Sequence, residues 1–229
     1  YLPASAYSLA CQTSLKSTER GMFSFCMCPG GFIVPAATAE GELAVNGMSP
    51  SRRDGKYANS GMVVAVELED ISTYKKAGPL AAMEFQADVE KNAWQMAGKT
   101  QAAPAQRLVD FLENRPSNML NDTSYQPGLN EVNMRELLPD FISKRMVQGF
   151  KHFKSKMKGY VTNDAQLIGI ESRTSSPVRI TRDVDTLEHP QIKGLIPCGE
   201  GAGYAGGIAS AAMDGEKCAL AANLALKRK

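Results

Sequence analysis

GLIPCGEGAGYAGGIASAAMDGEKCALAANLALKRK, residues 194–229, is the stretch that decides how the chain is interpreted. Its apolar start, residues 194–198, predicts a short strand, and the Ala-rich residues after Gly207 predict a helix. Between them GAGYAG, residues 201–206, matches the pattern GxGxxG in the strand–turn–helix context that gives the pattern meaning. Glycines let a ligand approach the backbone, and a helix start presents unpaired N–H groups to an anion or a carbonyl oxygen. The stretch therefore predicts a ligand-binding turn.

A complete dinucleotide-binding unit does not fit this turn. Such a unit needs a second strand that carries an acidic residue about 20 residues further on. The residues after Gly206 instead read as helix throughout and end in Lys227-Arg228-Lys229. A strand, a Gly-Glu turn and a closing helix suit the final element of a flavin domain, where the acidic side chain accepts hydrogen bonds from cofactor hydroxyls. The alternative, an Ala/Gly-rich helix that only packs tightly, stays open at this point.

The rest of the chain predicts an α+β fold. Its first third contains apolar runs separated by turn-forming residues, and a meander of antiparallel strands is the simplest arrangement. Ala39-Glu40-Gly41 separates two of these runs with hairpin-like spacing. The runs cover residues 22–27, 31–38, 42–48 and 62–68.

The middle of the chain predicts helices. Residues 80–97 have helical spacing between Pro79 and Gly98, and residues 104–115 follow the same logic with Pro104 at the helix start. Residues 116–135 predict a surface loop. Residues 136–159 predict one helix, or two broken near Pro139, with an inward face and a solvated lysine-rich face. The inward face comprises Phe141, Met146, Phe150 and Phe153.

Composition limits the class of protein. The net charge of +2 argues against nucleic acid as a partner, and no apolar run approaches the ~20 residues of a membrane helix. The five cysteines show neither CxxC nor zinc-finger spacing, which favours a reducing cytoplasm over a disulfide framework. With only two histidines, we expect no metal site. Because the chain begins with Tyr1 rather than Met, we expect a piece of a longer protein.

Four motifs, taken together, resemble a family of bacterial FAD-dependent dehydrogenases, the NAD(FAD)-utilising dehydrogenases. They are CMCPGG (residues 26–31), NGMSPSRRDGKYANS (46–60), ESRTSSPVRI (171–180) and PCGEGAGYAGGIASAAMDG (197–215). The similarity extends from about residue 1 to about residue 225. It implies a two-domain flavoprotein, with residues 1–172 as an inserted, substrate-side domain. Residues 173–229 would be the C-terminal strand–helix part of a Rossmann-like FAD domain.

The resemblance also implies an N-terminal Rossmann segment that holds the ADP half of FAD and that this chain lacks. We therefore expect the chain alone to be colourless and inactive, and the longer parent to be an FAD-dependent oxidoreductase. The expected partners are the missing N-terminal segment and a small-molecule substrate, with NAD(P)H as a candidate electron donor.

The cofactor contacts are likewise implied by resemblance. Glu200 would contact the ribityl chain or a neighbouring phosphate, the glycines would let the backbone approach, and Ile208 would begin a helix aimed at the flavin pyrimidine edge. The implied cofactor-binding residues are Arg173, Thr174, Ser175, Ser176 and Pro177 near the isoalloxazine ring, and Gly199, Glu200, Gly201, Gly203, Gly206, Gly207 and Ile208.

Cys26, Cys28 and Arg173 are the candidates for catalysis. Cys26 and Cys28 could form a redox pair, but residues i and i+2 of a strand share a face and thiols are common in cores, so a structural or pocket role is favoured. A guanidinium at Arg173 could hold a substrate carboxylate or an anionic flavin. Two alternatives stay open: a non-catalytic ligand-binding or structural module, and an RNA-linked flavoprotein suggested by the lysine-rich helix.

Overall fold

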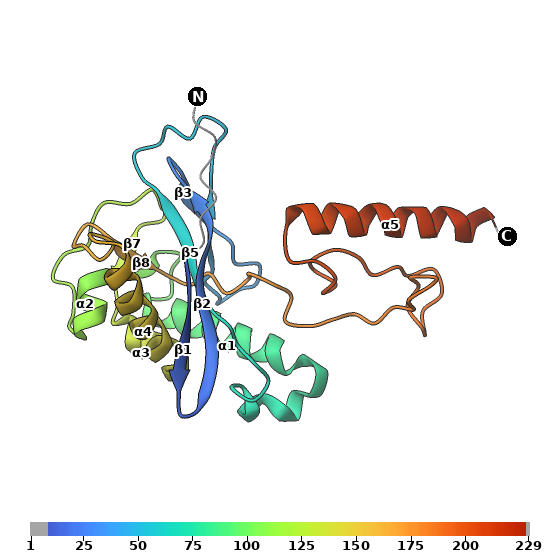
Figure 1. Cartoon of the computed structure of the whole chain (residues 1–229), viewed down its shortest axis with the longest axis horizontal. Coiled ribbons are helices and arrows are strands. Elements are labelled where there is room, and N and C mark those ends of the chain that lie inside the picture. The colour runs from blue at the N-terminus through green and yellow to red at the C-terminus, as the bar shows by residue number, and fades with distance from the viewer. Residues whose placement is uncertain (1–8, 228–229) are drawn as a thin grey trace. The chain divides into compact units, whose positions relative to one another are not determined.

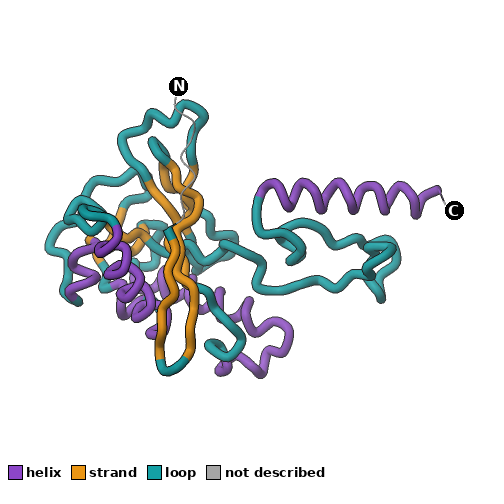
Figure 2. Tube along the Cα trace, viewed as in Figure 1, coloured by secondary structure: helices purple, strands orange, loops and turns teal. Residues whose placement is uncertain are grey.

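The computed structural model describes residues 9–227, and their contacts divide into two compact units (Figure 1). Unit 1 comprises the residues up to Ser72 together with Ala87–Ser172. Unit 2 comprises Thr73–Gln86 and the residues from Arg173 onward. In unit 1 the strands β1 to β5 come first, and helices with short strands follow, whereas the later part of unit 2 is loop followed by one long helix (Figure 2). The chain is a mixed α/β protein with antiparallel sheets, as the apolar pattern predicts.

Two small antiparallel sheets organise the first third of the chain. Strands β1 (Ala10–Leu15), β2 (Thr18–Cys28) and β5 (Asn59–Val64) form one sheet in the order β1-β2-β5. Strands β3 (Phe32–Pro35) and β4 (Val45–Met48) pair as the expected hairpin. The simple meander is wrong, because β2 pairs with β5 rather than with β3.

A third sheet places β6 (Ala103–Arg107) between β7 (Leu129–Glu131) and β8 (Gln166–Ile168). The helix predicted for residues 104–115 is therefore wrong in its first half, and only α2 (Leu108–Glu113) is helical. Pro104 pairs with Asn130 of β7 and lies just outside the β8 register, which covers residues 105–107. Its carbonyl still accepts a hydrogen bond from Gly169 N at 3.0 Å.

The other predicted helices are confirmed. Helix α1 (Ala81–Met96) follows an irregular 3₁₀ segment, η1 (Ser72–Leu80). The helical conformation is interrupted near Pro139, which separates α3 (Met134–Leu137) from α4 (Asp140–Lys156). Proline at the N-terminal boundary of α4 is compatible with a helix start because it lacks only an N–H that would have no partner there.

The main hydrophobic core belongs to unit 1, and α4 packs its apolar face into it. Met146, Phe150 and Phe153 are buried as predicted, whereas Phe141 is only half-buried. Arg145 on the same helix is 1% exposed, and its guanidinium donates to Thr13 O at 2.9 Å and to Thr18 Oγ1 at 2.7 Å. This buried cation ties α4 to the β1–β2 hairpin.

Unit 2 ends in α5 (Ile208–Lys227), the helix expected from the Ala-rich tail. The strand predicted at residues 194–198 is wrong: this stretch is irregular and joins none of the sheets formed by residues 9–227. Two of its carbonyl oxygens accept hydrogen bonds from outside any sheet: Leu195 O from His189 N, and Pro197 O from the Arg182 side chain. Within the described part of the chain, no helix combines the length and apolar character needed to cross a bilayer.

Candidate functional site

The serine-rich segment and the glycine turn, two of the four motifs, lie side by side in unit 2. Ser176 Oγ donates to Val178 O at 2.7 Å and contacts Gly201 O at 3.1 Å. Further along, Ile180 N donates to Ala202 O at 3.1 Å, and the Tyr204 hydroxyl donates back to Ile180 O at 2.9 Å. These bonds join residues 176–180 to residues 201–204, so a ligand seated on the turn would also meet the serine-rich segment.

The glycines of the turn fall into two groups. Gly199 and Gly203 have φ of +72° and +83°, and a Cβ at Gly203 would lie 2.7 Å from Val178 O, so the turn itself requires these two glycines. Gly201, Gly206 and Gly207 have no such requirement, because an added Cβ would meet nothing within 4 Å in the described part of the chain. Their lack of a side chain leaves room for a group from outside.

The remaining cofactor candidates border this open turn. Ile208 begins α5 and is 94% exposed. Gly206 N donates a hydrogen bond to Ser210 Oγ at 3.3 Å. The backbone carbonyl of Glu200 accepts a hydrogen bond from Gly203 N at 2.9 Å. Among residues 9–227, none donates a hydrogen bond to the Glu200 carboxylate. An acidic side chain and a helix start therefore flank the exposed glycines.

Thr174, Ser175 and Pro177 complete the serine-rich segment. Ser175 is exposed, whereas Thr174 and Pro177 are partly exposed. Arg173, the first residue of this part of unit 2, is also exposed and makes contacts of its own. The whole segment lies at the surface of unit 2, where a ligand can reach it.

An arginine–aspartate pair, which the motifs do not single out, supports the turn. Arg182 Nη2 lies 2.6 Å from Asp214 Oδ1 and its Nη1 lies 2.9 Å from Oδ2, a bidentate pair. Both side chains are about nine-tenths buried, and the guanidinium also covers the Tyr204 ring at 3.6 Å. The bond from Arg182, followed by one from Gly199 N at 2.9 Å, lowers the pKa of Asp214 to about 2. The pair anchors the glycine turn to α5.

The sequence contained one signal for this pair. Asp214 is an acidic residue within a helix otherwise rich in Ala and Gly, and it lies inside the fourth motif. Its partner lies 32 residues earlier in a loop, so no local spacing could connect the two.

The first two motifs meet in unit 1. The CMCPGG turn packs against the polar loop of the second motif: Gly55 N donates to Gly30 O at 3.2 Å. A Cβ on Gly31 would lie 2.8 Å from Cys28 O and 2.7 Å from the Cys28 side chain. The glycines of CMCPGG are thus explained by close backbone packing within the unit.

The geometry of the two thiols differs from the strand-based expectation. A β-bulge shifts the β2–β5 register between Phe25 and Cys28, and Cys26 takes a φ of +46°. As a result Cys26 is exposed and Cys28 is buried, so they do not share a face. The Cys28 thiol donates to the Cys26 carbonyl oxygen at 3.1 Å.

Two further polar groups lie near Cys28. The Glu171 carboxyl lies against Gly61, beside the Phe25 ring, and burial raises its pKa. Burial, and then the charge of Glu171, raise the pKa of the Cys28 thiol. The Asn59 carboxamide is enclosed, and neither of its polar atoms has a hydrogen-bond partner within residues 9–227. The Cys28 thiol, the Glu171 carboxyl and the Asn59 amide form a polar cluster, the Cys28 cluster. All three residues lie within the motifs, but the sequence did not predict that they come together.

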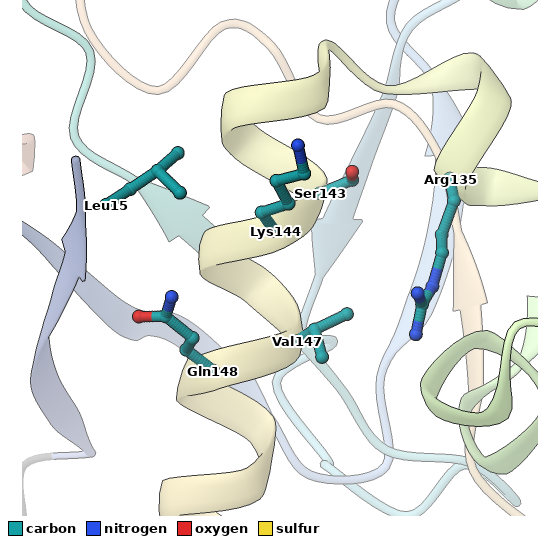
Figure 3. A pocket seen from close by; sticks show the side chains of 6 residues that line it. All are labelled: Leu15, Arg135, Ser143, Lys144, Val147 and Gln148. Atoms are coloured by element: carbon teal, nitrogen blue, oxygen red, sulfur yellow. The ribbon is translucent and has the colours of Figure 1, made fainter.

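A surface hollow of about 240 Å³ elsewhere in unit 1 contains none of the predicted site residues (Figure 3). Its polar groups already have protein partners: Arg135 donates to Phe111 O and Leu112 O, and Gln148 bonds both backbone groups of Ser14. The hollow is lined by Leu15, Arg135, Ser143, Lys144, Val147 and Gln148. We do not assign it a function.

No metal centre is evident in the part of the chain that the structure describes, since no three His, Cys, Asp or Glu side chains gather there as ligands.

The fold and the two polar clusters define a mixed α/β protein with an open glycine turn. Comparison with known proteins identifies its family: the chain belongs to the family described as "FAD-dependent protein, C-terminal domain-like", which matches residues 1–174. It is also similar to an uncharacterized protein of Clostridium beijerinckii (strain ATCC 51743 / NCIMB 8052), with 46% identity over 220 residues. That alignment covers 95% of this chain but 40% of the relative's length.

Proposed function

We propose that this chain is part of an FAD-dependent oxidoreductase, in which residues 173–229 complete the flavin site and residues 1–172 face the substrate. The family supports an association with FAD, and the dehydrogenase activity, the substrate-side role and the cofactor contacts are the proposal. When bound, FAD supplies the transfer of hydride or electrons, and the protein supplies binding, orientation and electrostatics.

The observation that carries this proposal is the open side of the glycine turn. Gly201, Gly206 and Gly207 are free of packing constraints, which fits close approach of a cofactor to the backbone. The residues that would hold FAD are the turn from Gly199 to Gly207, with Gly203 shaping it, the Glu200 carboxylate and the start of α5 at Ile208. The segment Arg173–Pro177 would lie beside the ring, because Ser176 already contacts the turn.

The apolar surface of α5 supports a second part of the proposal. Side chains at one face of the helix are exposed, among them Met213 (71%), Leu220 (59%) and Leu224 (56%). Monomeric proteins rarely leave a continuous apolar face in water. We propose that the covering partner is the segment of the full-length protein that holds the ADP half of FAD, since this chain spans 40% of the length of its relative.

In unit 1, the Cys28 cluster is the candidate substrate-side group. Burial raises the pKa of the Glu171 carboxyl and so favours its protonated form. Cys26 and Arg173 stay candidates, Cys26 as an exposed thiol and Arg173 as a cation for an acidic substrate.

The test uses the full-length protein and matched glycine substitutions. Gly206→Ala and Gly207→Ala each add one methyl group to the open side of the turn. Gly215→Ala adds the same methyl group within α5, where it also meets nothing within 4 Å. We expect the first two to weaken FAD binding by about tenfold, which corresponds to about 1.4 kcal/mol, and the third to leave it unchanged. Equal affinities in all three variants would remove the cofactor role of the turn.

The alternative, a non-catalytic ligand-binding or structural module, predicts a different spectrum. The purified full-length protein would then lack a flavin absorption band and would not bleach on addition of NAD(P)H. We expect the band to be present in the full-length protein and absent from residues 1–229 alone.

A further inference from the structure

Two arginines of unit 2 lie against the same tyrosine ring beside the glycine turn. The Cζ atom of Arg182 lies 3.6 Å from the centroid of the Tyr204 ring, and that of Arg179 lies 5.1 Å from it. The ring is held in place by its hydroxyl, which donates to Ile180 O at 2.9 Å. Both cations therefore lie close to the turn, of which Tyr204 is a part.

The two arginines differ in how their charges are balanced. Arg182 is about nine-tenths buried and forms the bidentate pair with Asp214 described above. Arg179 is exposed, and among residues 9–227 no carboxylate forms an ion pair with it. Within the described part of the chain, one of the two positive charges beside the turn is therefore unpaired.

Arg179 is fixed to the turn through one side of its guanidinium. Its Nε donates to Gly203 O at 2.9 Å, and its Cα and Cβ lie 3.0 and 3.1 Å from the position that a Cβ on Gly203 would take. Its two Nη atoms make no hydrogen bond to any residue of the range 9–227. A guanidinium held in this way presents its remaining N–H groups as a planar fork, which suits the oxygens of a phosphate. Because the side chain is already ordered, it loses less conformational entropy when a ligand binds.

We propose that Arg179 binds a phosphate group of the cofactor at the glycine turn. This inference rests on the proposed function, and it adds the residue that recognises the anionic part of the ligand. The Glu200 carboxylate on the same turn receives no hydrogen bond from residues 9–227, so it is available to accept from hydroxyl groups. An acceptor for hydroxyls on the turn and a phosphate donor bonded to the turn together suit a polyol phosphate. In FAD, the ribityl chain and the phosphate joined to it have this chemistry.

The experiment measures the affinity of the full-length protein for oxidised FAD, by the quenching of flavin fluorescence, in matched variants that each lose one positive charge. Arg179→Gln removes the guanidinium, and Lys193→Gln is the control, since Lys193 is exposed in the same unit. We expect Arg179→Gln to weaken binding by about tenfold, the effect of losing a charged hydrogen bond, and Lys193→Gln to leave it unchanged. Arg179→Lys should recover part of the loss, because an ammonium keeps the charge but not the planar fork. Equal affinities of Arg179→Gln and Lys193→Gln would overturn the proposal.

The dependence of binding on salt separates a phosphate contact from a structural effect of the substitution. The ring of oxidised FAD is uncharged, so the phosphates carry the charge whose attraction to Arg179 is screened by salt. We expect the affinity of the wild type and of Lys193→Gln to fall more steeply with sodium chloride concentration than that of Arg179→Gln. A variant that only distorts the turn would bind more weakly at every salt concentration but keep the wild-type slope. That result would also overturn the proposal.

The glycine variants distinguish failure of this inference from failure of the proposed function. If Gly206→Ala and Gly207→Ala weaken FAD binding and Arg179→Gln does not, the turn remains the cofactor site and Arg179 loses its assigned role. If none of the three variants weakens binding, the cofactor role of the turn and the role of Arg179 are both wrong.

Discussion

Helices α4 and α5 are both long, but α4 buries its apolar side chains whereas α5 leaves most of its apolar side chains exposed. Helix α4 places Met146, Phe150 and Phe153 in the core of unit 1, and its polar face is in water. Helix α5 buries one side chain fully, Cys218, and exposes several leucines and a methionine. The comparison teaches that unit 1 contains the contacts that its helix needs, whereas unit 2 leaves most apolar side chains of α5 exposed.

The largest expected effect contrasts one residue from each helix. Phe150→Ala on α4 should lower the free energy of unfolding by about 3–5 kcal/mol, because Phe150 is 1% exposed and its ring meets Phe111 edge-on. Leu224→Ala on α5 should change it by less than about 0.5 kcal/mol in this chain, because Leu224 is 56% exposed. Urea unfolding of both variants measures the difference. A cost for Leu224→Ala comparable to that for Phe150→Ala would mean that α5 has a core of its own.

A second prediction compares the chain with its full-length parent. The double substitution Leu220→Glu and Leu224→Glu should leave the chain's unfolding free energy nearly unchanged. In the full-length protein it should cost about 2–3 kcal/mol, since two carboxyl groups would be taken out of water at the proposed interface. Thermal or urea unfolding with FAD present measures this. The same small cost in both proteins would mean that the exposed face of α5 has no intramolecular partner.

The third prediction concerns the pair that holds α5 to the glycine turn. Asp214→Asn removes the anion from Arg182 and should cost about 2 kcal/mol of local stability, the usual size for a charged hydrogen bond. Hydrogen exchange of the α5 amides is the appropriate measurement, because the loss is confined to unit 2. Asp183→Asn is a matched control, since Asp183 is exposed in the same unit and bonds only nearby residues such as Thr186. Equal protection of α5 in the two variants would deny the pair its anchoring role.

The same pair predicts a dependence on pH. The pKa of Asp214 in the folded protein is about 2, below its ordinary value of 3.8, so folding favours the ionised carboxylate. The stabilisation is therefore complete above the ordinary value and is lost as the pH falls from there toward 2. Hydrogen exchange of α5 in acid should show this loss in the wild type and lack it in Asp214→Asn. Protection that stays constant in the wild type as the pH falls to 2 would contradict the assignment.

The smallest expected effect contrasts the two buried thiols. The charge of Glu171 raises the pKa of Cys28, whereas Arg182 counteracts the effect of burial at Cys218. Glu171→Gln should therefore lower the pKa of Cys28 and leave that of Cys218 unchanged. The pH dependence of alkylation, followed for each cysteine by mass spectrometry, reports both values. An unchanged Cys28 profile would place Glu171 too far away to act in the Cys28 cluster.

Much of the fold could be predicted because its signals are local. The β3–β4 hairpin, α1 and the division between α3 and α4 follow from apolar periodicity and from the proline and glycine residues at their ends. Strand β6 was missed because Pro104 suits both a helix start and a strand end, and only its partners β7 and β8 decide between them. Residues 194–198 are apolar like a strand, but an apolar run becomes one only where a neighbouring strand accepts its hydrogen bonds.

The candidate site divides in the same way. Resemblance placed the serine-rich segment near the glycine turn, and the bond between Ser176 and Gly201 brings them together within this unit. The bulge at Cys26, the Cys28 cluster and the pair between Arg182 and Asp214 were not predicted. Each depends on residues that are distant in sequence or on a register shift between strands. Neither kind of feature produces a periodic pattern in the sequence.

The sequence by itself determined the glycine turn, the helix after it, and the strands of the first third followed by helices in the middle, because turn formation and amphipathic spacing act over a few residues. Only the tertiary structure decided which strands pair, which of Cys26 and Cys28 is buried, and that Cys218 lies beside Arg182. Those outcomes depend on contacts between distant segments, whose energies arise only once the chain has closed the loops between them.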